Sequence, residues 1–139
     1  MSTPTQAPRR ARRVYLSGGM EYASDEGRGW RSECEAWLVG ELGCMVFNPN
    51  RESERFLASR VPGADFRRLK QEDPDRFQAL VRDIVALDCA EIAERTDFVI
   101  CYWDQGAISG AGTKGEVTIA RYFDKPVYLV TAVPTGDIP

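Results

Sequence analysis

Short apolar runs alternate with longer amphipathic stretches along the chain. An apolar run bounded by turn residues predicts a buried strand, and apolar positions at three- and four-residue spacing predict a helix with one buried face. The expected strands span residues 13–17, 44–47, 97–103 and 126–130. The expected helices span residues 27–42, 74–95 and 114–123, with short helical pieces over 51–72 that break at Pro62-Gly63.

Residues with known positional preferences mark the ends of several of these elements. Asp73 suits the N-cap of the long helix, and Pro74 suits its first helical position. Ser24 and Asp25 can cap the first helix in the same way. Residues 104–113 are dominated by small residues and glycines, so they predict a loop.

The order of the elements predicts the fold class. Strands that alternate with helices pair in parallel, through right-handed crossovers that place helices on both faces of the sheet. We therefore expect an α/β protein: one three-layer Rossmann-like (flavodoxin-like) domain over residues 13–139, with a parallel sheet of about four to five strands. Residues 1–12 are polar and basic and predict a disordered tail. Ligands bind beyond the carboxyl ends of such strands, where residues 17–29, 48–52 and 104–116 lie.

Composition then narrows the chemistry. The 139 residues include 18 Lys+Arg, 21 Asp+Glu and no histidine. Without histidine there is no Ser-His-Asp or Cys-His triad and no His-ligated metal site. Acid–base chemistry near neutral pH must therefore come from carboxylates, tyrosine, lysine or cysteine in tuned environments.

Charge and cysteine usage indicate the setting in which the protein works. The net charge of −3 disfavours nucleic acid as a partner of the folded body. No apolar run is long enough to span a bilayer, and the N-terminus lacks the apolar core of a signal peptide. Cys34, Cys44, Cys89 and Cys101 form no CxxC pair and have apolar neighbours, which is typical of reduced, buried thiols. We expect a cytoplasmic protein with no membrane partner.

Asp88 is a candidate catalytic residue because it interrupts an apolar helix face. Ile84, Asp88 and Ile92 follow one another at four-residue spacing. A carboxylate in such a stripe costs free energy unless it is paired or faces a cleft. A partly desolvated Asp has a raised pKa and can act as an acid. The alternative is an Asp at the exposed edge of the stripe, or one bonded to a backbone N–H.

Three further features lie at the carboxyl ends of the expected strands. Two of them are glycine-rich segments that follow a strand, and the third is a tyrosine near the end of the first strand. The segment after the first strand lacks the dinucleotide and Walker patterns, so a tight turn is its simplest interpretation. The second segment places Thr113 and Glu116 around the first turn of a helix, where they suit either a capping box or a site. Tyr15 lies near the carboxyl end of the first strand, where it is either a core residue or a partner of a carboxylate in the cleft.

Together these elements resemble the nucleoside 2-deoxyribosyltransferase family and the related nucleotide N-glycosidases. The resemblance covers about residues 13–131 and rests on the order and spacing of five elements. These are Tyr15-Leu16-Ser17-Gly18 after a basic lead, Asp88 within a helix, Asp97 opening an apolar strand, Gly112-Thr113-x-x-Glu116, and Lys125-Pro126-Val127.

The resemblance implies an enzyme that cleaves the N-glycosidic bond of a (deoxy)nucleoside or nucleoside monophosphate and transfers the sugar to another base or to water. It implies that Glu116 attacks the anomeric carbon to give a covalent glycosyl-enzyme, that Asp88 handles the proton at the departing base, and that Tyr15 orients Glu116. Such a bond breaks through an oxocarbenium-like state, which two carboxylic side chains can serve without a metal or other cofactor. The resemblance further implies a homo-oligomer of at least two chains.

Residues that contact the substrate are expected in the three segments that follow the strands. The expected set is Ser17, Gly18, Gly19, Met20, Tyr22, Asp25, Trp30, Asn48, Asp104, Ser109, Gly110, Gly112 and Thr113. For Trp30, the alternative to substrate contact is packing in the hydrophobic core. Gly110 stands six residues before Glu116, where deoxynucleoside-type members carry Asp and monophosphate-type members carry Ser. The 5′ group of the substrate therefore stays open.

Two other functions remain open at this point. The Gly-Ala-Gly-Thr-Lys-Gly-Glu segment at 110–116 resembles the GGxGTxxE segment of the "lonely guy" type phosphoribohydrolases. A further Arg-containing motif of that family has no counterpart that we can place. A Rossmann-like module that senses a nucleotide without turnover is the other alternative.

Overall fold

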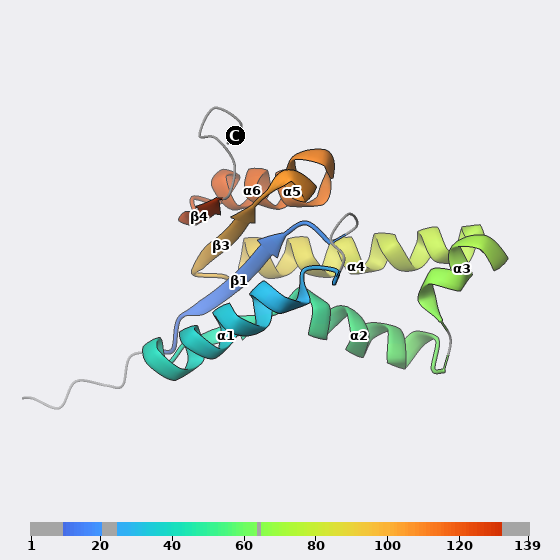
Figure 1. The fold of residues 1–139 in the computed structure, drawn as a ribbon, viewed down its shortest axis with the longest axis horizontal. Coiled ribbons are helices and arrows are strands. Elements are labelled where there is room, and N and C mark those ends of the chain that lie inside the picture. Colours follow the sequence, from blue (N-terminus) through green and yellow to red (C-terminus); the bar gives the residue numbers. More distant parts are fainter. Residues whose placement is uncertain (1–9, 21–24, 64, 132–139) are drawn as a thin grey trace, which may run out of the picture.

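Four parallel strands and six helices make up the part of the chain that the structure describes (Figure 1). This computed structural model describes residues 10–20, 25–63 and 65–131. The elements in chain order are β1 (Arg13–Gly18), α1 (Arg28–Leu42), β2 (Met45–Phe47), α2 (Pro49–Arg60), α3 (Phe66–Glu72), α4 (Pro74–Glu94), β3 (Phe98–Trp103), α5 (Gln105–Ser109), α6 (Gly112–Tyr122) and β4 (Val127–Thr131).

The strands form one sheet in the order β2-β1-β3-β4, with every pair parallel. In its centre Tyr15 is in register with Val99 and Ser17 with Cys101. The crossover from β1 leads outward to β2, whereas the crossover from β3 leads outward to β4 on the other side. The strand order therefore reverses between β1 and β3, which is where sheets of this class bind ligands. The expected α/β, Rossmann-like fold is confirmed.

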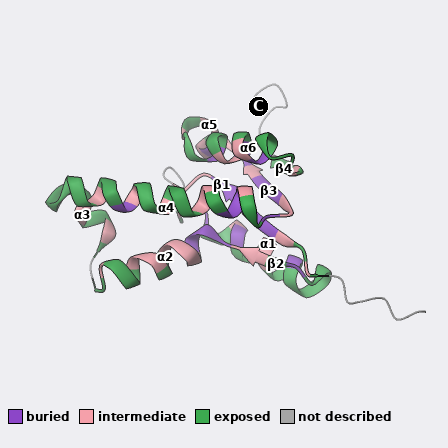
Figure 2. Ribbon diagram, turned by 180° about the vertical axis from the view of Figure 1, so that it is seen from behind, coloured by how far each residue is buried: buried purple, intermediate pink, exposed green. Residues whose placement is uncertain are grey.

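Helices cover both faces of this sheet. On one face Leu38 of α1 packs with Leu16, and both side chains are fully buried. On the other face Ile92 of α4 and Ala120 of α6 pack around Val99. Figure 1 shows α1 in front of the sheet and α4 behind it, and in Figure 2 the buried residues concentrate on β1 and β3. Each fully buried Leu or Ile stabilises the fold by about 1.5–3 kcal/mol relative to an exposed one.

Carboxylates bind free backbone N–H groups at the starts of α1 and α4. Asp73 accepts a hydrogen bond from a backbone N–H in the first turn of α4, and Pro74 is its first residue, as the sequence predicts. At α1 the Asp25 carboxylate accepts hydrogen bonds from the backbone N–H groups of Gly27 and Gly29, both at 2.9 Å. The N-cap residue of α1 is Gly27, and Asp25, two residues earlier, binds free N–H groups at this end, which is close to the expected capping role. Ser24 lies outside the described residues.

The expected loop over 104–113 is wrong in part, because it contains a short helix and the start of another. The Asp104 carboxylate accepts a hydrogen bond of 2.9 Å from the Ala107 backbone N–H and so caps α5. α6 begins at Gly112, two residues before the expected start at 114. Burial of Ala107 and Thr113 against the fold outweighs the weak helix propensity of a glycine-rich segment.

Other expected elements lie within a residue or two of their predicted ends. Residues 51–72 form helical pieces, α2 and α3, separated around Pro62-Gly63 as predicted. Of the predicted tail, residues 1–9 lie outside the described part, and Arg10 forms an ion pair of 3.1 Å with Asp97. Across the described ranges, no helix is both long enough and apolar enough to cross a bilayer.

Candidate active site

A cleft of about 580 Å³ opens beyond the carboxyl ends of β1 and β3, next to the point where the strand order reverses. Its walls come from β1 and the segment after it, α1, α4 and the α5–α6 region. The volume lies in the range of small-molecule sites. Among the residues predicted from sequence, those that line the cleft are Tyr15, Gly18, Gly19, Met20, Asp88, Gly110, Gly112, Thr113 and Glu116.

The Glu116 carboxylate is held by two hydroxyl groups from β1. Tyr15 donates its phenolic proton to Oε2 of Glu116, and Ser17 donates a hydrogen bond of 3.1 Å to Oε1. Tyr15 and Ser17 are fully buried and share one face of β1 because they lie two residues apart. Each carboxylate oxygen thus has its own donor, which fixes the plane of the group. Tyr15 is both a core residue and a partner of the cleft carboxylate.

Asp88 reaches the same cleft from α4. Ile92, one turn later, is fully buried against the sheet, whereas Ile84, one turn earlier, lines the cleft. The apolar face of α4 therefore passes from the core into the wall of the cleft, and Asp88 lies where the two meet. The Asp88 side chain is half-buried. The alternative in which Asp88 lies at the exposed edge of the apolar face therefore does not hold.

The surroundings of these groups raise all three pKa values. Burial raises the pKa of Glu116 from 4.5 to about 7, against the opposing effect of the hydrogen bonds from Tyr15 and Ser17 and of the Arg31 charge. Burial, and then the charge of Glu116, raise the pKa of Asp88 to about 7 as well. Burial, followed by the same two carboxylates, raises the pKa of Tyr15 well above its ordinary value.

The hydrogen bonds distinguish the two carboxyl groups of the cleft. Glu116 accepts two hydrogen bonds, and such bonds favour the ionised form. At Asp88, burial and the charge of Glu116 raise the pKa against the opposing effects of Tyr15 and of the Arg31 charge. Glu116, with two donors fixed on it, therefore suits the ionised role, and Asp88 suits the protonated one.

Close packing explains the two glycines at the end of β1, Gly18 and Gly19. A Cβ at Gly18 would lie 2.6 Å from Cζ2 of Trp30, and a Cβ at Gly19 would lie 3.0 Å from the Ala107 backbone nitrogen. Side chains at these positions would push α1 or α5 away from the cleft. At Gly18 and Gly19 the backbone therefore packs closely against α1 and α5 at the cleft wall.

The N-terminal turn of α6 forms another part of the cleft wall. The capping-box alternative for Thr113 and Glu116 does not hold, because α6 begins after Ala111 without a side-chain cap and the Glu116 carboxylate bonds to β1 instead. Thr113 is almost fully buried and lines the cleft. Free N–H groups and the positive end of the helix dipole make such a turn suitable for an anion.

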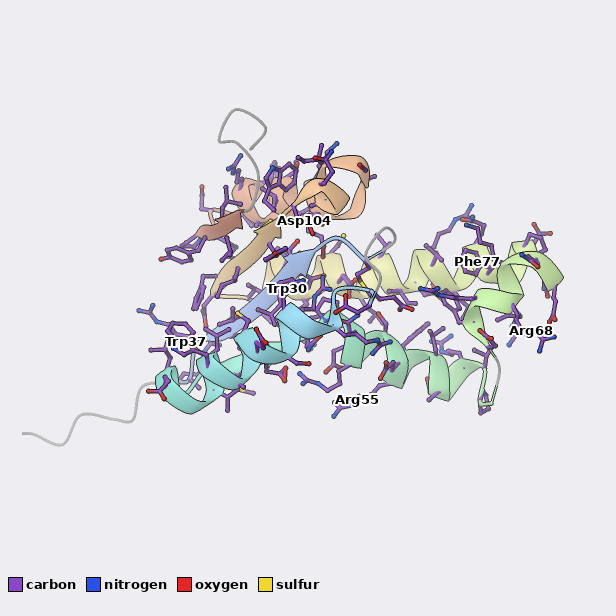
Figure 3. The ribbon with its side chains drawn as sticks, viewed as in Figure 1. Trp30, Trp37, Arg55, Arg68, Phe77 and Asp104 are labelled. Carbon is purple, nitrogen blue, oxygen red and sulfur yellow. The ribbon has the colours of Figure 1, made fainter. Side chains whose placement is uncertain are left out.

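Several residues expected to contact a substrate lie elsewhere. Trp30 stacks on Tyr102 with ring centroids 5.3 Å apart and packs against the core, which is the alternative its position allowed. In Figure 3, Trp30 is labelled at the start of α1, and Asp104 lies at the end of β3. Asp25, Asn48 and Asp104 are helix caps and do not line the cleft. Ser109 ends α5 and also does not line it, whereas Tyr22 lies outside the described residues.

Arg31 lines the cleft and is absent from the residues predicted from sequence. Its side chain is 1% exposed and donates hydrogen bonds to backbone carbonyls, the shortest to Gly18 at 2.9 Å. The signal was present: Arg31 stands seven residues before Leu38, on the buried stripe of α1. A charged residue on the buried face of α1 indicates a polar cleft in the same way as Asp88 does on the apolar face of α4.

The described residues offer no arrangement typical of a metal centre. Within residues 10–20, 25–63 and 65–131, no three histidine, cysteine, aspartate or glutamate side chains gather as metal ligands would. All four cysteines are free thiols. The Glu116 carboxylate of the cleft is instead bonded to hydroxyl groups.

Comparisons of the chain with protein-family models, with curated proteins and with solved structures found no match. Function is therefore inferred from the side chains of the cleft.

Proposed function

We propose that this protein cleaves the N-glycosidic bond of a nucleoside or nucleoside monophosphate through a covalent glycosyl-Glu116 intermediate. The observation that carries the proposal is the pairing, in one cleft, of a carboxylate oriented by two hydroxyl donors with a second, half-buried carboxyl group. One group suits attack on the sugar, and the other suits protonation of the base. The resemblance to the nucleoside 2-deoxyribosyltransferases assigns the same roles to the same residues.

In the first half of the reaction, an oxygen of Glu116 forms a bond to the anomeric carbon while the bond from that carbon to the base nitrogen breaks. The electron pair of the broken bond goes to the base, which takes a proton from Asp88. Tyr15 and Ser17 hold the Glu116 carboxylate in place. Because the side chain is already ordered, little of its conformational entropy is lost when the bond to the sugar forms. Asp88 ends this half as a carboxylate.

In the second half, water or a second base attacks the same carbon and displaces Glu116. The proton of the attacking molecule passes to Asp88, which restores the starting protonation state of both groups. A carboxyl with a pKa near neutrality can give and take this proton without a large penalty in either direction. Water as acceptor makes the protein a hydrolase, and a base as acceptor makes it a transferase.

The N-terminal turn of α6 favours a 5′-monophosphate over a 5′-hydroxyl group. Gly110, Gly112 and Thr113 line the cleft at this turn, and Thr113 adds a buried hydroxyl. The helix dipole and the free N–H groups stabilise a phosphate far more than a neutral hydroxyl group. A monophosphate is therefore expected to have a lower KM than its nucleoside.

The test is a panel of ribonucleosides, deoxyribonucleosides and their monophosphates, incubated with the protein with and without an acceptor base. Chromatography then measures the free base. Release without acceptor indicates a hydrolase, and exchange only with acceptor indicates a transferase. Glu116→Gln and Asp88→Asn should each abolish release, whereas Glu33→Gln, at an exposed position of α1, should match wild type. A protein that binds members of the panel but releases no base would be the nucleotide-sensing module, and this proposal would be wrong.

We further propose that the protein is a cytoplasmic homo-oligomer of at least two chains. Its free thiols suit a reducing compartment. Tyr122 of α6 is 81% exposed and Tyr128 of β4 is 58% exposed, so both offer aromatic surface to a partner chain. Sedimentation equilibrium tests this directly, and a monomer at micromolar concentration would contradict it.

A further inference from the structure

Arg31 is a buried cation whose hydrogen bonds go to neutral oxygens. Its side chain is 1% exposed. Nε donates to the Leu16 carbonyl at 3.3 Å, Nη2 to the Gly18 carbonyl at 2.9 Å, and Nη1 to the Glu26 and Gly27 carbonyls at 3.3 and 3.4 Å. Nη1 also lies 3.4 Å from the amide oxygen of Asn50. None of these acceptors carries a charge, so they leave the positive charge of the guanidinium uncompensated.

A buried charge without a compensating charge is costly, which raises the question of what offsets it. Arg31 lines the same cleft as Tyr15, Asp88 and Glu116. The acidic groups that act on its charge are Glu116 from α6, Tyr15 from β1, Asp88 from α4 and Asp25 at the start of α1, with Glu116 the strongest. The buried positive charge of Arg31 is thus offset mainly by the Glu116 carboxylate, which lies in the same cleft.

The same guanidinium connects the backbone segments that form the cleft wall. Its acceptors lie in β1 (Leu16 and Gly18), in the turn before α1 (Glu26 and Gly27) and in α2 (Asn50). Arginine presents five N–H donors in a rigid fork, whereas lysine presents three on one flexible nitrogen. Only an arginine can bridge these carbonyls at once.

We propose that Arg31 is a positioning residue of the reaction: it supplies the counter-charge that keeps Glu116 ionised, and it holds the Gly18 end of β1 against the start of α1 and against α2. This inference rests on the proposed function and adds to it a residue that acts through Glu116. Without the charge of Arg31, the buried pair would retain its protons to higher pH, and the nucleophile would be neutral at neutral pH.

The test measures the titration of Glu116 directly, without substrate. The protein is labelled with ¹³C at the glutamate carboxyl carbons, and the Glu116 resonance is assigned as the one missing from Glu116→Gln. Arg31→Gln should raise the pH midpoint of this resonance by about 1 pH unit or more, the usual effect of removing an opposite charge at close range. Arg31→Lys should keep the midpoint near that of wild type, because the charge remains. Arg28→Gln, which removes an exposed positive charge from the same helix, should leave the midpoint unchanged.

Activity provides the second measurement. If the wild type releases base, Arg31→Gln should lower kcat at pH 7 by roughly tenfold or more and shift the acidic limb of the pH profile upward. Arg31→Lys should retain the position of that limb while its kcat/KM falls, because the bridge between the carbonyls is lost.

Two outcomes overturn the inference, and both differ from failure of the proposed function. A Glu116 midpoint unchanged in Arg31→Gln, or raised as far in Arg28→Gln, would show that Arg31 does not balance this charge, even if the wild type is an active glycosidase. Absence of base release by the wild type would instead refute the proposed function. If Arg31→Gln does not fold, Arg31→Lys carries the test, because it loses the bridge but keeps the charge; a Glu116 midpoint raised in Arg31→Lys as well would overturn the inference.

Discussion

Replacing Glu116 with glutamine should stabilise the protein at alkaline pH. The glutamine side chain would keep an oxygen for the Tyr15 hydroxyl and would place an amide near Ser17, so the local hydrogen bonds are largely retained. The substitution removes the ability to ionise and, with it, the negative charge that raises the pKa of Asp88. In the folded wild type the pKa of Glu116 is raised, so the folded state binds this proton more tightly than the unfolded state. The stability that the proton confers is present at low pH and is lost as the pH rises through the folded pKa.

The magnitude follows from the two pKa values. A rise from 4.5 to about 7 in the folded state corresponds to roughly 3 kcal/mol, because each pH unit between the folded and unfolded values is worth about 1.4 kcal/mol. The advantage of Glu116→Gln over wild type should therefore be near zero at about pH 4.5, grow through roughly pH 5–7, and level off at roughly 3 kcal/mol by about pH 8. This difference is the cost of keeping a buried nucleophile ionised.

Urea denaturation at a series of pH values from about 4.5 to 8.5 measures this difference. At about pH 8 the midpoint of Glu116→Gln should exceed that of wild type by about 1–2 M, given typical urea dependences for small domains. Glu33→Gln, on the exposed side of α1, is the matched control and should follow the wild-type curve at every pH. A Glu116→Gln curve that runs parallel to wild type over this whole range would refute the raised pKa and the reasoning built on it.

Other substitutions have equally specific outcomes. Tyr15→Phe removes one of the two donors to Glu116 and should lower kcat by roughly tenfold or more with little change in KM, which steady-state kinetics on the best substrate would detect; an unchanged kcat would remove Tyr15 from the site. Leu38→Ala deletes a fully buried side chain and should cost about 3 kcal/mol in urea denaturation, whereas a loss below about 1 kcal/mol would indicate a loosely packed α1. Arg13→Met takes away the closest ion-pair partner, at 2.7 Å, of the almost fully buried Glu91 and should cost roughly 3 kcal/mol at pH 7. A loss below about 1 kcal/mol would show that this ion pair contributes little to the stability of the fold.

Hydrophobic periodicity was sufficient to predict most of the fold. The strands and the long helices have strong patterns, because each buries one continuous apolar face or run in the sheet or against it. Asp88 was predictable for the same reason, since a carboxylate inside an apolar stripe indicates a polar cleft. Tyr15 and Glu116 lie 101 residues apart, and only the parallel order of β1 and β3 brings them together.

What the sequence did not reveal depends on tertiary contacts. α5 forms in a glycine-rich segment because Asp104 caps it and Ala107 is buried, and neither effect has a periodic signature. The same ambiguity affected Asp25 and Asn48, because a carboxylate or amide after a strand can bind a ligand or cap the next helix with equal ease. Arg31 was missed because a charged residue near a helix start is usually exposed, and its carbonyl partners are set by the turn of the backbone.

The central claim is that Glu116 forms a covalent bond to a sugar during turnover. Intact-protein mass spectrometry of the protein quenched in acid during turnover of its best substrate tests this most directly, followed by peptide mapping. We predict an added mass of one pentosyl group, carried as its phosphate ester if the substrate is a monophosphate, on the peptide that contains Glu116 and absent from Glu116→Gln. Release of base with an unmodified protein mass, or an adduct that persists in Glu116→Gln, would contradict the account.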